Sequence, residues 1–160
     1  MLQTSHNNKI TVMGNGGWGT TLAILLQKKG YEVILWGADS LYTKYLREKR
    51  ENIKYLKGIR IPSEIHITSD ISKKLTEAQL IVSAVPTPYL RSVLVKFKVV
   101  FNDKIPVVSV TKGIENDTLM RPSEIIADVL GKIPICLLLG PSHAEEVSLG
   151  LPTTIVASSN

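Results

Sequence analysis

The sequence is poor in cysteine and histidine. Cys136 is the only cysteine among the 160 residues, so no disulfide can form within the chain, and a reducing, cytoplasmic location is expected. Cys136 lies in the apolar run 133–139, which predicts a buried strand residue rather than a nucleophile. The histidines His6, His66 and His143 are scattered and have no cysteine partners, so no metal site is expected.

Long apolar runs and aromatic residues are also scarce. No apolar run is long enough to span a bilayer, and the polar residues 1–8 lack a signal core, so we expect them to form a flexible lead-in. Aromatic residues make up 6% of the chain, without a nucleic-acid-binding motif, which argues against a nucleic-acid partner. The net charge is +5, with the basic residues concentrated in 44–60. A solvated helix face explains that cluster, although a mild positive field also favours anionic ligands.

Short apolar runs alternate regularly with helical segments along the chain. The runs predict strands at 10–13, 32–36, 80–85, 107–110, 135–139 and 154–157, with a further short strand at 65–68. Helices are expected at 20–29, 40–51, 88–98, 121–130 and 142–149. This alternation predicts one Rossmann-type domain over 1–160, an α/β fold with a doubly wound, mostly parallel sheet and helices on both faces. Ligands of such sheets bind at the carboxyl ends of the strands.

Two of the expected helices carry more detailed signals. In the first, Leu22, Leu25 and Leu26 form one apolar stripe. The last opens with Ser142 and has Glu145 three residues later, which is the pattern of a capping box.

A glycine-rich turn joins the first strand to the first helix. Gly14, Gly16 and Gly19 form the pattern G-x-G-x-x-G, which between a strand and a helix indicates a dinucleotide-binding turn rather than a merely flexible one. Gly14 permits the tight turn, Gly16 lets the backbone approach a pyrophosphate, and Gly19 lets the helix pack closely on the strand. The helix N-terminus then offers N–H groups to the phosphates.

The choice between NAD and NADP depends on the residues after the second strand. Asp39 lies 20 residues after Gly19 (39 − 19 = 20), the usual place of an acid that binds the adenosine ribose, but it is equally suited to cap the next helix. No arginine stands at 37–38 to receive a 2′-phosphate, which leaves Lys44 or Arg47 as candidates. Both cofactors therefore stay open, with a slight preference for NAD.

Three further segments follow predicted strands. The prolines of 85–88 form either a wall for a nicotinamide or simply a rigid loop. Lys112 stands at a strand tip, where it binds phosphate or is an ordinary surface lysine. Gly140 and Ser142 precede a new helix, a second candidate anion site, with Ser142 alternatively a helix cap. The position of His143 would suit a general acid, but nothing else in the sequence favours that role, and a structural role is the simpler interpretation.

Taken together, the motifs resemble the NAD(P)-dependent glycerol-3-phosphate dehydrogenases. The resemblance extends from about Lys9 to the end of the chain. It is carried, in order, by 14–23, 52–56, 85–87, 111–115, 123–124, 140–147 and 151–154.

This resemblance implies reduction of dihydroxyacetone phosphate by NADH or NADPH to sn-glycerol 3-phosphate, which feeds glycerophospholipid synthesis. It implies cofactor contacts at Gly17, Trp18 and Ala144. Lys112 would touch both cofactor and substrate, and substrate would also bind at Gly140 and Ser142.

The family also has a helical second domain that supplies a catalytic lysine, and it suggests a homodimer. That domain is not found in 1–160, so we expect this chain to bind cofactor without turnover. The family often has a basic residue or histidine where this chain has 37–38, which weakens the case for NADPH. Two alternatives remain at this point: another dehydrogenase with a similar N-terminal domain, and a stand-alone dinucleotide-binding or redox-sensing module.

Overall fold

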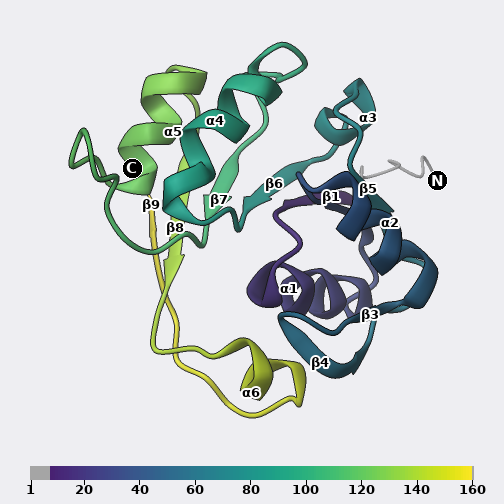
Figure 1. The fold of residues 1–160 in the computed structure, drawn as a ribbon. Helices are drawn as coiled ribbons and strands as arrows, with labels where there is room; N and C mark the ends of the chain where they lie inside the picture. The colour runs from purple at the N-terminus through teal and green to yellow at the C-terminus, as the bar shows by residue number, and fades with distance from the viewer. Residues whose placement is uncertain (1–7, 160) are drawn as a thin grey trace, which may run out of the picture.

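The computed structural model describes residues 8–159 and contains one large sheet covered by helices (Figure 1). Its seven strands lie in the order β5-β2-β1-β6-β7-β8-β9. The strands are β1 (Lys9–Met13), β2 (Glu32–Trp36), β5 (His66–Thr68), β6 (Leu80–Ser83), β7 (Val107–Ser109), β8 (Ile135–Leu139) and β9 (Val156–Ser159). All neighbouring strands run parallel except β8 and β9, which are antiparallel. The mostly parallel Rossmann-type sheet expected from the sequence is confirmed.

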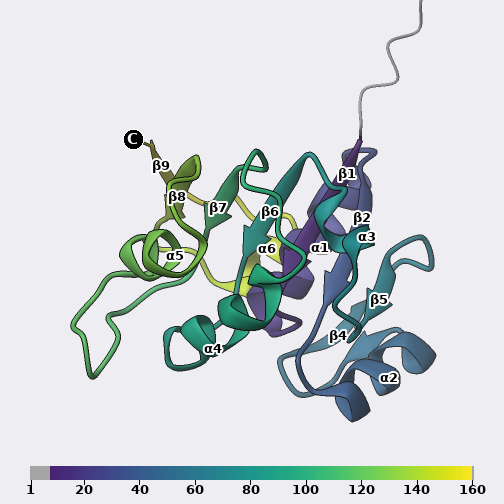
Figure 2. The ribbon, with the colours of Figure 1, turned by 90° about the horizontal axis from the view of Figure 1, so that it is seen from above.

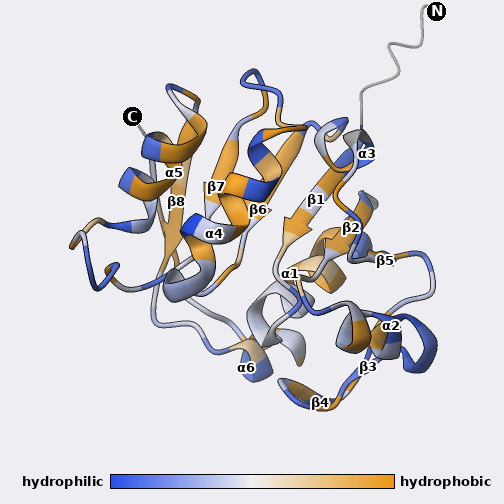
Figure 3. Ribbon diagram, turned by 45° about the horizontal axis from the view of Figure 1, so that its top comes forward, coloured by the Kyte–Doolittle hydropathy of each residue, from blue (hydrophilic) through white to orange (hydrophobic). Residues whose placement is uncertain are grey.

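Helices cover both faces of this sheet, as Figure 2 shows from above. They are α1 (Gly17–Lys28), α2 (Ser40–Lys49), α3 (Lys73–Thr76), α4 (Thr87–Lys98), α5 (Pro122–Leu130) and α6 (Ala144–Ser148). Phe97 of α4 and Ile126 of α5 belong to one buried cluster, and Ile24 of α1 and Leu46 of α2 belong to the other. The central strands β1, β2, β6 and β7 are mostly apolar and buried (Figure 3) because both of their faces are covered.

The basic segment 44–60 is not a single solvated helix face. Helix α2 ends at Lys49, and the chain then forms a hairpin of β3 (Glu51–Asn52) and β4 (Leu56–Arg60), which the sequence analysis missed. Leu56 is buried in the second cluster, so the hairpin packs against the body of the domain. With only two residues, β3 is too short to show an alternating pattern.

Two helices differ in detail from expectation. The leucine stripe of α1 is only half-buried, and Ala23 and Ile24 make the deeper contacts. The capping box expected from Ser142 to Glu145 is wrong. Helix α6 begins at Ala144, its N-cap is His143, and no side-chain cap bond forms there among the described residues.

The two ends of the chain also bear on earlier expectations. Of the expected flexible lead-in, residues 1–7 lie outside the described part, whereas the Asn8 side chain donates a hydrogen bond to the carbonyl of Gly30 at 2.6 Å. The last strand, expected at 154–157, is found two residues later, at Val156–Ser159. Cys136 lies in β8 as predicted, but it is half-buried rather than fully buried.

Candidate functional site

The glycine-rich turn connects β1 to α1 at the carboxyl edge of the sheet. Gly14 has a φ of +108°, a conformation that side chains disfavour, and its N–H donates to the carbonyl of Trp36 at 2.8 Å. A Cβ at Gly19 would overlap the carbonyl oxygen of Gly14, whereas a Cβ at Gly16 would meet nothing within 4 Å. Gly14 and Gly19 therefore serve the fold, and the backbone at Gly16 faces open space.

Asn52 of the hairpin holds this turn from the protein side. Its side chain is 0% exposed, and its amide donates to the carbonyl of Asn15 at 3.0 Å and to the hydroxyl of Thr20 at 2.8 Å. Its amide oxygen accepts a hydrogen bond from the hydroxyl of Tyr42 at 2.6 Å. In the sequence Asn52 stands out only as part of a family motif, because nothing there shows which turn a distant asparagine reaches.

A pocket of about 240 Å³ opens beside the turn, at the carboxyl ends of three strands. Its lining comes from four segments: Trp18, 84–86, 110–112 and 142–144. The structure thus brings together Trp18, Lys112, Ser142 and Ala144, which the sequence analysis selected from distant parts of the chain.

Lys112 stands between this pocket and a second one of about 390 Å³, lined by residues that include Gly140 and Arg121. Its ammonium group donates to the carbonyl of Gly140 at 3.0 Å, and its own carbonyl accepts from the hydroxyl of Thr87 at 2.7 Å. The lysine is exposed but fixed at both ends. It can present a positive charge to an anion in either pocket.

An ion-pair network fixes the loop that follows Lys112. Arg91 of α4 donates from two nitrogens to the carboxylate of Glu115, at 2.8 to 3.2 Å, and also pairs with Asp128 of α5. Hydrogen bonding to Arg91, then to Thr118, lowers the pKa of Glu115 below its ordinary value. In the same loop Arg121 holds the pKa of Glu124 at about 2 through side-chain and backbone hydrogen bonds. Both carboxylates are therefore ionised near neutral pH.

Asp39 caps helix α2, because its carboxylate accepts a hydrogen bond from the N–H of Tyr42 at 3.0 Å. The capping role left open by the sequence is thus present, and binding of a ribose by the same carboxylate stays a prediction. The ammonium nitrogen of Lys44, a candidate for binding a 2′-phosphate, lies 3.9 Å from a carboxylate oxygen of Glu48 in the same helix. Trp36, at the end of β2, is 2% exposed and its indole N–H donates to the carbonyl of Ser69.

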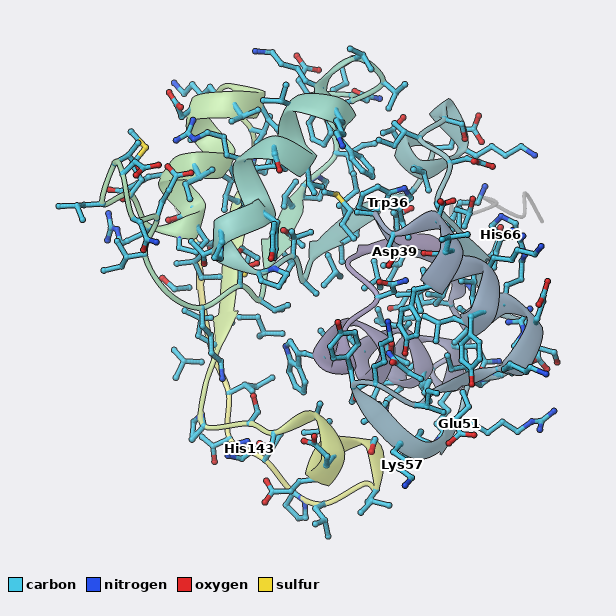
Figure 4. All side chains as sticks on the ribbon, viewed as in Figure 1. Trp36, Asp39, Glu51, Lys57, His66 and His143 are labelled. Atoms are coloured by element: carbon cyan, nitrogen blue, oxygen red, sulfur yellow. The ribbon has the colours of Figure 1, made fainter. Side chains whose placement is uncertain are left out.

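His143 lies at the margin of the 240 Å³ pocket and is exposed. In Figure 4 it lies beside α6, far from Asp39 and His66. Within residues 8–159, no three histidine, cysteine or acidic side chains gather into a group that could hold a metal ion. In that same part of the chain, no helix has the length and apolar character needed to cross a lipid bilayer.

The comparison with known families agrees with this geometry. A model described as the N-terminus of NAD-dependent glycerol-3-phosphate dehydrogenase matches residues 9–160. This chain belongs to the NAD-dependent glycerol-3-phosphate dehydrogenase family. The turn, the pocket and Lys112 accordingly belong to the family's dinucleotide-binding domain, and other dehydrogenase families with similar N-terminal domains are set aside.

Curated and solved relatives give the same result. Glycerol-3-phosphate dehydrogenase [NAD(P)+] of Chlorobium phaeobacteroides is 45% identical over 154 residues, which cover 94% of this chain and 46% of the relative. The glycerol-3-phosphate dehydrogenase [NAD(P)+] of Clostridium perfringens is 40% identical over 152 residues, which cover 95% of this chain and 46% of the relative. The crystal structure of glycerol-3-phosphate dehydrogenase from Coxiella burnetii matches with a TM-score of 0.87 at 31% sequence identity. The match covers 95% of this chain and 46% of the Coxiella burnetii chain. The chain thus spans about half the length of these glycerol-3-phosphate dehydrogenases.

Proposed function

We propose that residues 1–160 form the dinucleotide-binding domain of an sn-glycerol-3-phosphate dehydrogenase. In this proposal the pyrophosphate of NAD or NADP lies on the glycine-rich turn, contacting 14–19, and the nicotinamide enters the 240 Å³ pocket beside Trp18 and Ala144. Lys112, Gly140 and Ser142 face the phosphorylated substrate. By family resemblance, the complete enzyme would be a cytoplasmic homodimer that supplies glycerophospholipid synthesis.

One observation carries this proposal. The pocket joins the turn to the ends of β6, β7 and β8, and Gly16 faces open space in the turn next to it. A ligand that spans both places must be elongated, with an anionic middle to meet the N-terminus of α1 and a flat end to fill the pocket. A dinucleotide has these properties, and this edge of a doubly wound sheet is where such ligands bind.

The chemistry follows from the charges available. When bound, the reduced nicotinamide supplies a hydride, which adds to the ketone carbon of dihydroxyacetone phosphate. The carbonyl oxygen then becomes an alkoxide and takes up one proton to give the alcohol, so a positioned acid or cation is required. Lys112 offers a cation beside the pocket, and the resemblance assigns the proton donor to a lysine of the second domain.

The proposal is tested by titrating this chain with NADH and then NADPH while following tryptophan fluorescence. Trp18 lines the pocket and Trp36 is buried elsewhere, so we expect saturable quenching with energy transfer to the nicotinamide. A Trp18→Phe variant is the control and should lose the part of that signal that arises at the pocket, while Trp36, whose carbonyl contacts Gly14, still transfers energy. Absence of quenching by either nucleotide up to millimolar concentration would contradict the proposal.

A second measurement separates binding from turnover. We expect no oxidation of NADH when this chain is mixed with dihydroxyacetone phosphate, because the proton donor is expected outside residues 1–160. Detectable, enzyme-dependent oxidation would show that Lys112 or another residue of this chain completes the reaction.

A further inference from the structure

The buried side chain of Asn52 contacts the glycine-rich turn at the two peptide units that flank Gly16. Its amide nitrogen lies 3.0 Å from the carbonyl oxygen of Asn15 and 3.5 Å from that of Gly16. The same nitrogen donates to the hydroxyl of Thr20 at 2.8 Å. One side chain thus links the glycine-rich turn to Thr20 near the start of helix α1.

These contacts determine which way the backbone N–H groups of the turn point. In a trans peptide unit the C=O and the N–H point in opposite directions, and residues 8–159 contain no cis peptide bond. The carbonyl of Asn15 is held toward Asn52, and that of Gly16, which also accepts from the N–H of Thr20 at 3.0 Å, lies within 3.5 Å of the same amide. The N–H groups of Gly16 and Gly17 therefore face the other way. A Cβ at Gly16 would meet nothing within 4 Å, so the backbone at this residue is open to a ligand.

The opposite end of the Asn52 amide is fixed independently. Its oxygen accepts hydrogen bonds from the hydroxyl of Tyr42 at 2.6 Å and from the N–H of Tyr55 at 3.3 Å. The Tyr42 hydroxyl also accepts from the N–H of Lys54 at 3.2 Å. The amide is therefore held so that its nitrogen, and not its oxygen, faces the turn.

We propose that Asn52 is a positioning residue that aims the N–H groups of Gly16 and Gly17 at the ligand's phosphates. This inference rests on the proposed function for the identity of the ligand, but the orientation of the two N–H groups does not. Asn52 touches neither phosphate nor nicotinamide and acts only through the turn.

The Asn52→Asp variant tests this directly. It preserves the oxygen that accepts from Tyr42 and replaces the donor that faces the turn with a second oxygen, which repels both carbonyls. Asn52→Ala removes the donor without adding a charge and serves if the aspartate variant does not fold. Tyr42→Phe is the matched control, because it removes one hydrogen bond to the same amide but leaves the N–H of Tyr55 to hold the amide oxygen away from the turn.

Two readouts are needed. Without ligand, the backbone amide signals of Gly16 and Gly17 in a ¹⁵N–¹H spectrum should shift in both Asn52 variants and stay near their wild-type positions in Tyr42→Phe. With ligand, the dissociation constants for NADH and ADP should rise on the order of tenfold in the Asn52 variants, while that for adenosine, which has no phosphate, and those of Tyr42→Phe stay within about twofold.

Each outcome is decisive. If a folded Asn52 variant retains the wild-type Gly16 and Gly17 signals, or binds NADH as tightly as the wild type does, the positioning role is wrong. If Tyr42→Phe weakens NADH binding as much as the Asn52 variants do, general destabilisation explains the loss and the proposal is also wrong. If the wild-type chain binds neither NADH nor ADP, the proposed function fails, and the amide signals alone decide whether Asn52 orients the turn.

Discussion

At the scale of single residues, Gly16 and Gly19 belong to one turn but have opposite surroundings. A methyl group at Gly19 would overlap the carbonyl of Gly14, whereas one at Gly16 would project into open space. Gly16 has a φ of −71°, which alanine readily adopts. The same substitution therefore has separable effects at the two positions.

We predict that Gly19→Ala destabilises the fold by about 3 kcal/mol or more, because the helix must move away from the strand. Gly16→Ala should leave the melting temperature nearly unchanged and weaken NADH binding, because its methyl group fills the space that a pyrophosphate would occupy. Thermal unfolding and nucleotide titration of both variants check this. Equal effects of the two substitutions on stability would contradict the prediction.

Asp39 combines a visible role with a predicted one. As the N-cap of α2 it accepts from the N–H of Tyr42, a contact that asparagine can also make. Asp39→Asn should therefore keep the melting temperature but weaken NADH binding about tenfold if the charge binds the ribose. Asp39→Ala should in addition lower stability by about 1 kcal/mol. Unchanged NADH affinity in Asp39→Asn would leave capping as the residue's whole function.

At the scale of secondary-structure elements, α4, α5 and the loop between β7 and α5 are joined by Arg91. Its guanidinium pairs with Glu115 in the loop and with Asp128 in α5. This loop spans residues 110–121 and includes Lys112, so the network helps to hold the segment in which Lys112 stands.

The pKa of Glu115 gives this network a pH dependence. A carboxylate whose pKa is lowered by folding contributes stability that is fully present above its unfolded pKa and is lost as the pH falls through the folded value. Glu115→Gln should therefore be less stable than the wild type at pH 7, and the difference should shrink once the pH falls below the ordinary value of 4.5. Thermal midpoints measured from pH 7 down to pH 3 test this.

The matched control is Glu124→Gln. The pKa of Glu124 falls from its ordinary 4.5 to about 2 on folding, so its deficit should also begin to shrink below pH 4.5, remain partial at pH 3 and vanish only near pH 2. A Glu115→Gln deficit that grows as the pH falls would have the wrong sign for the proposed ion pair.

Elements with strong periodic patterns were predictable from the sequence, whereas those without them were not. The five parallel strands β2, β1, β6, β7 and β8 are mostly apolar runs, and these were found. The hairpin of β3 and β4 was missed because two residues cannot show a period. The cap of α6 was misassigned because Ser142 and Glu145 have the right spacing, whereas the helix begins later, at Ala144.

At the scale of the whole molecule, the two buried clusters lie on opposite faces of one sheet. Ile81 and Val82 are neighbours in β6, yet they belong to different clusters. Neither cluster can lose its packing without disturbing strands that the other needs, so we expect the clusters to unfold together.

Trp36 and Tyr42 report on the two clusters separately. In a Trp18→Phe background, tryptophan fluorescence follows the first cluster and near-ultraviolet tyrosine circular dichroism follows the second. We predict coincident urea transitions with the same midpoint. Two separate transitions would show that the faces of the sheet unfold independently.

The candidate site was predictable where residues follow strands, and not where they act from a distance. The rule that ligands bind at the carboxyl ends of parallel strands selected Lys112 and Ser142 without knowledge of their contacts. Asn52 and Arg91 lie outside that rule. Their roles depend on which segments fold against them, and this tertiary contact has no periodic signature in the sequence.

Gly37 limits how this domain can be redesigned. A Cβ at this position would overlap the side-chain amide of Asn15, whose nitrogen donates to the hydroxyl of Thr43. An engineer who wished to install an arginine for the 2′-phosphate of NADP would therefore disturb the glycine-rich turn by placing it at 37. Ala38 is exposed and next in the chain, so a change of cofactor specificity should start there.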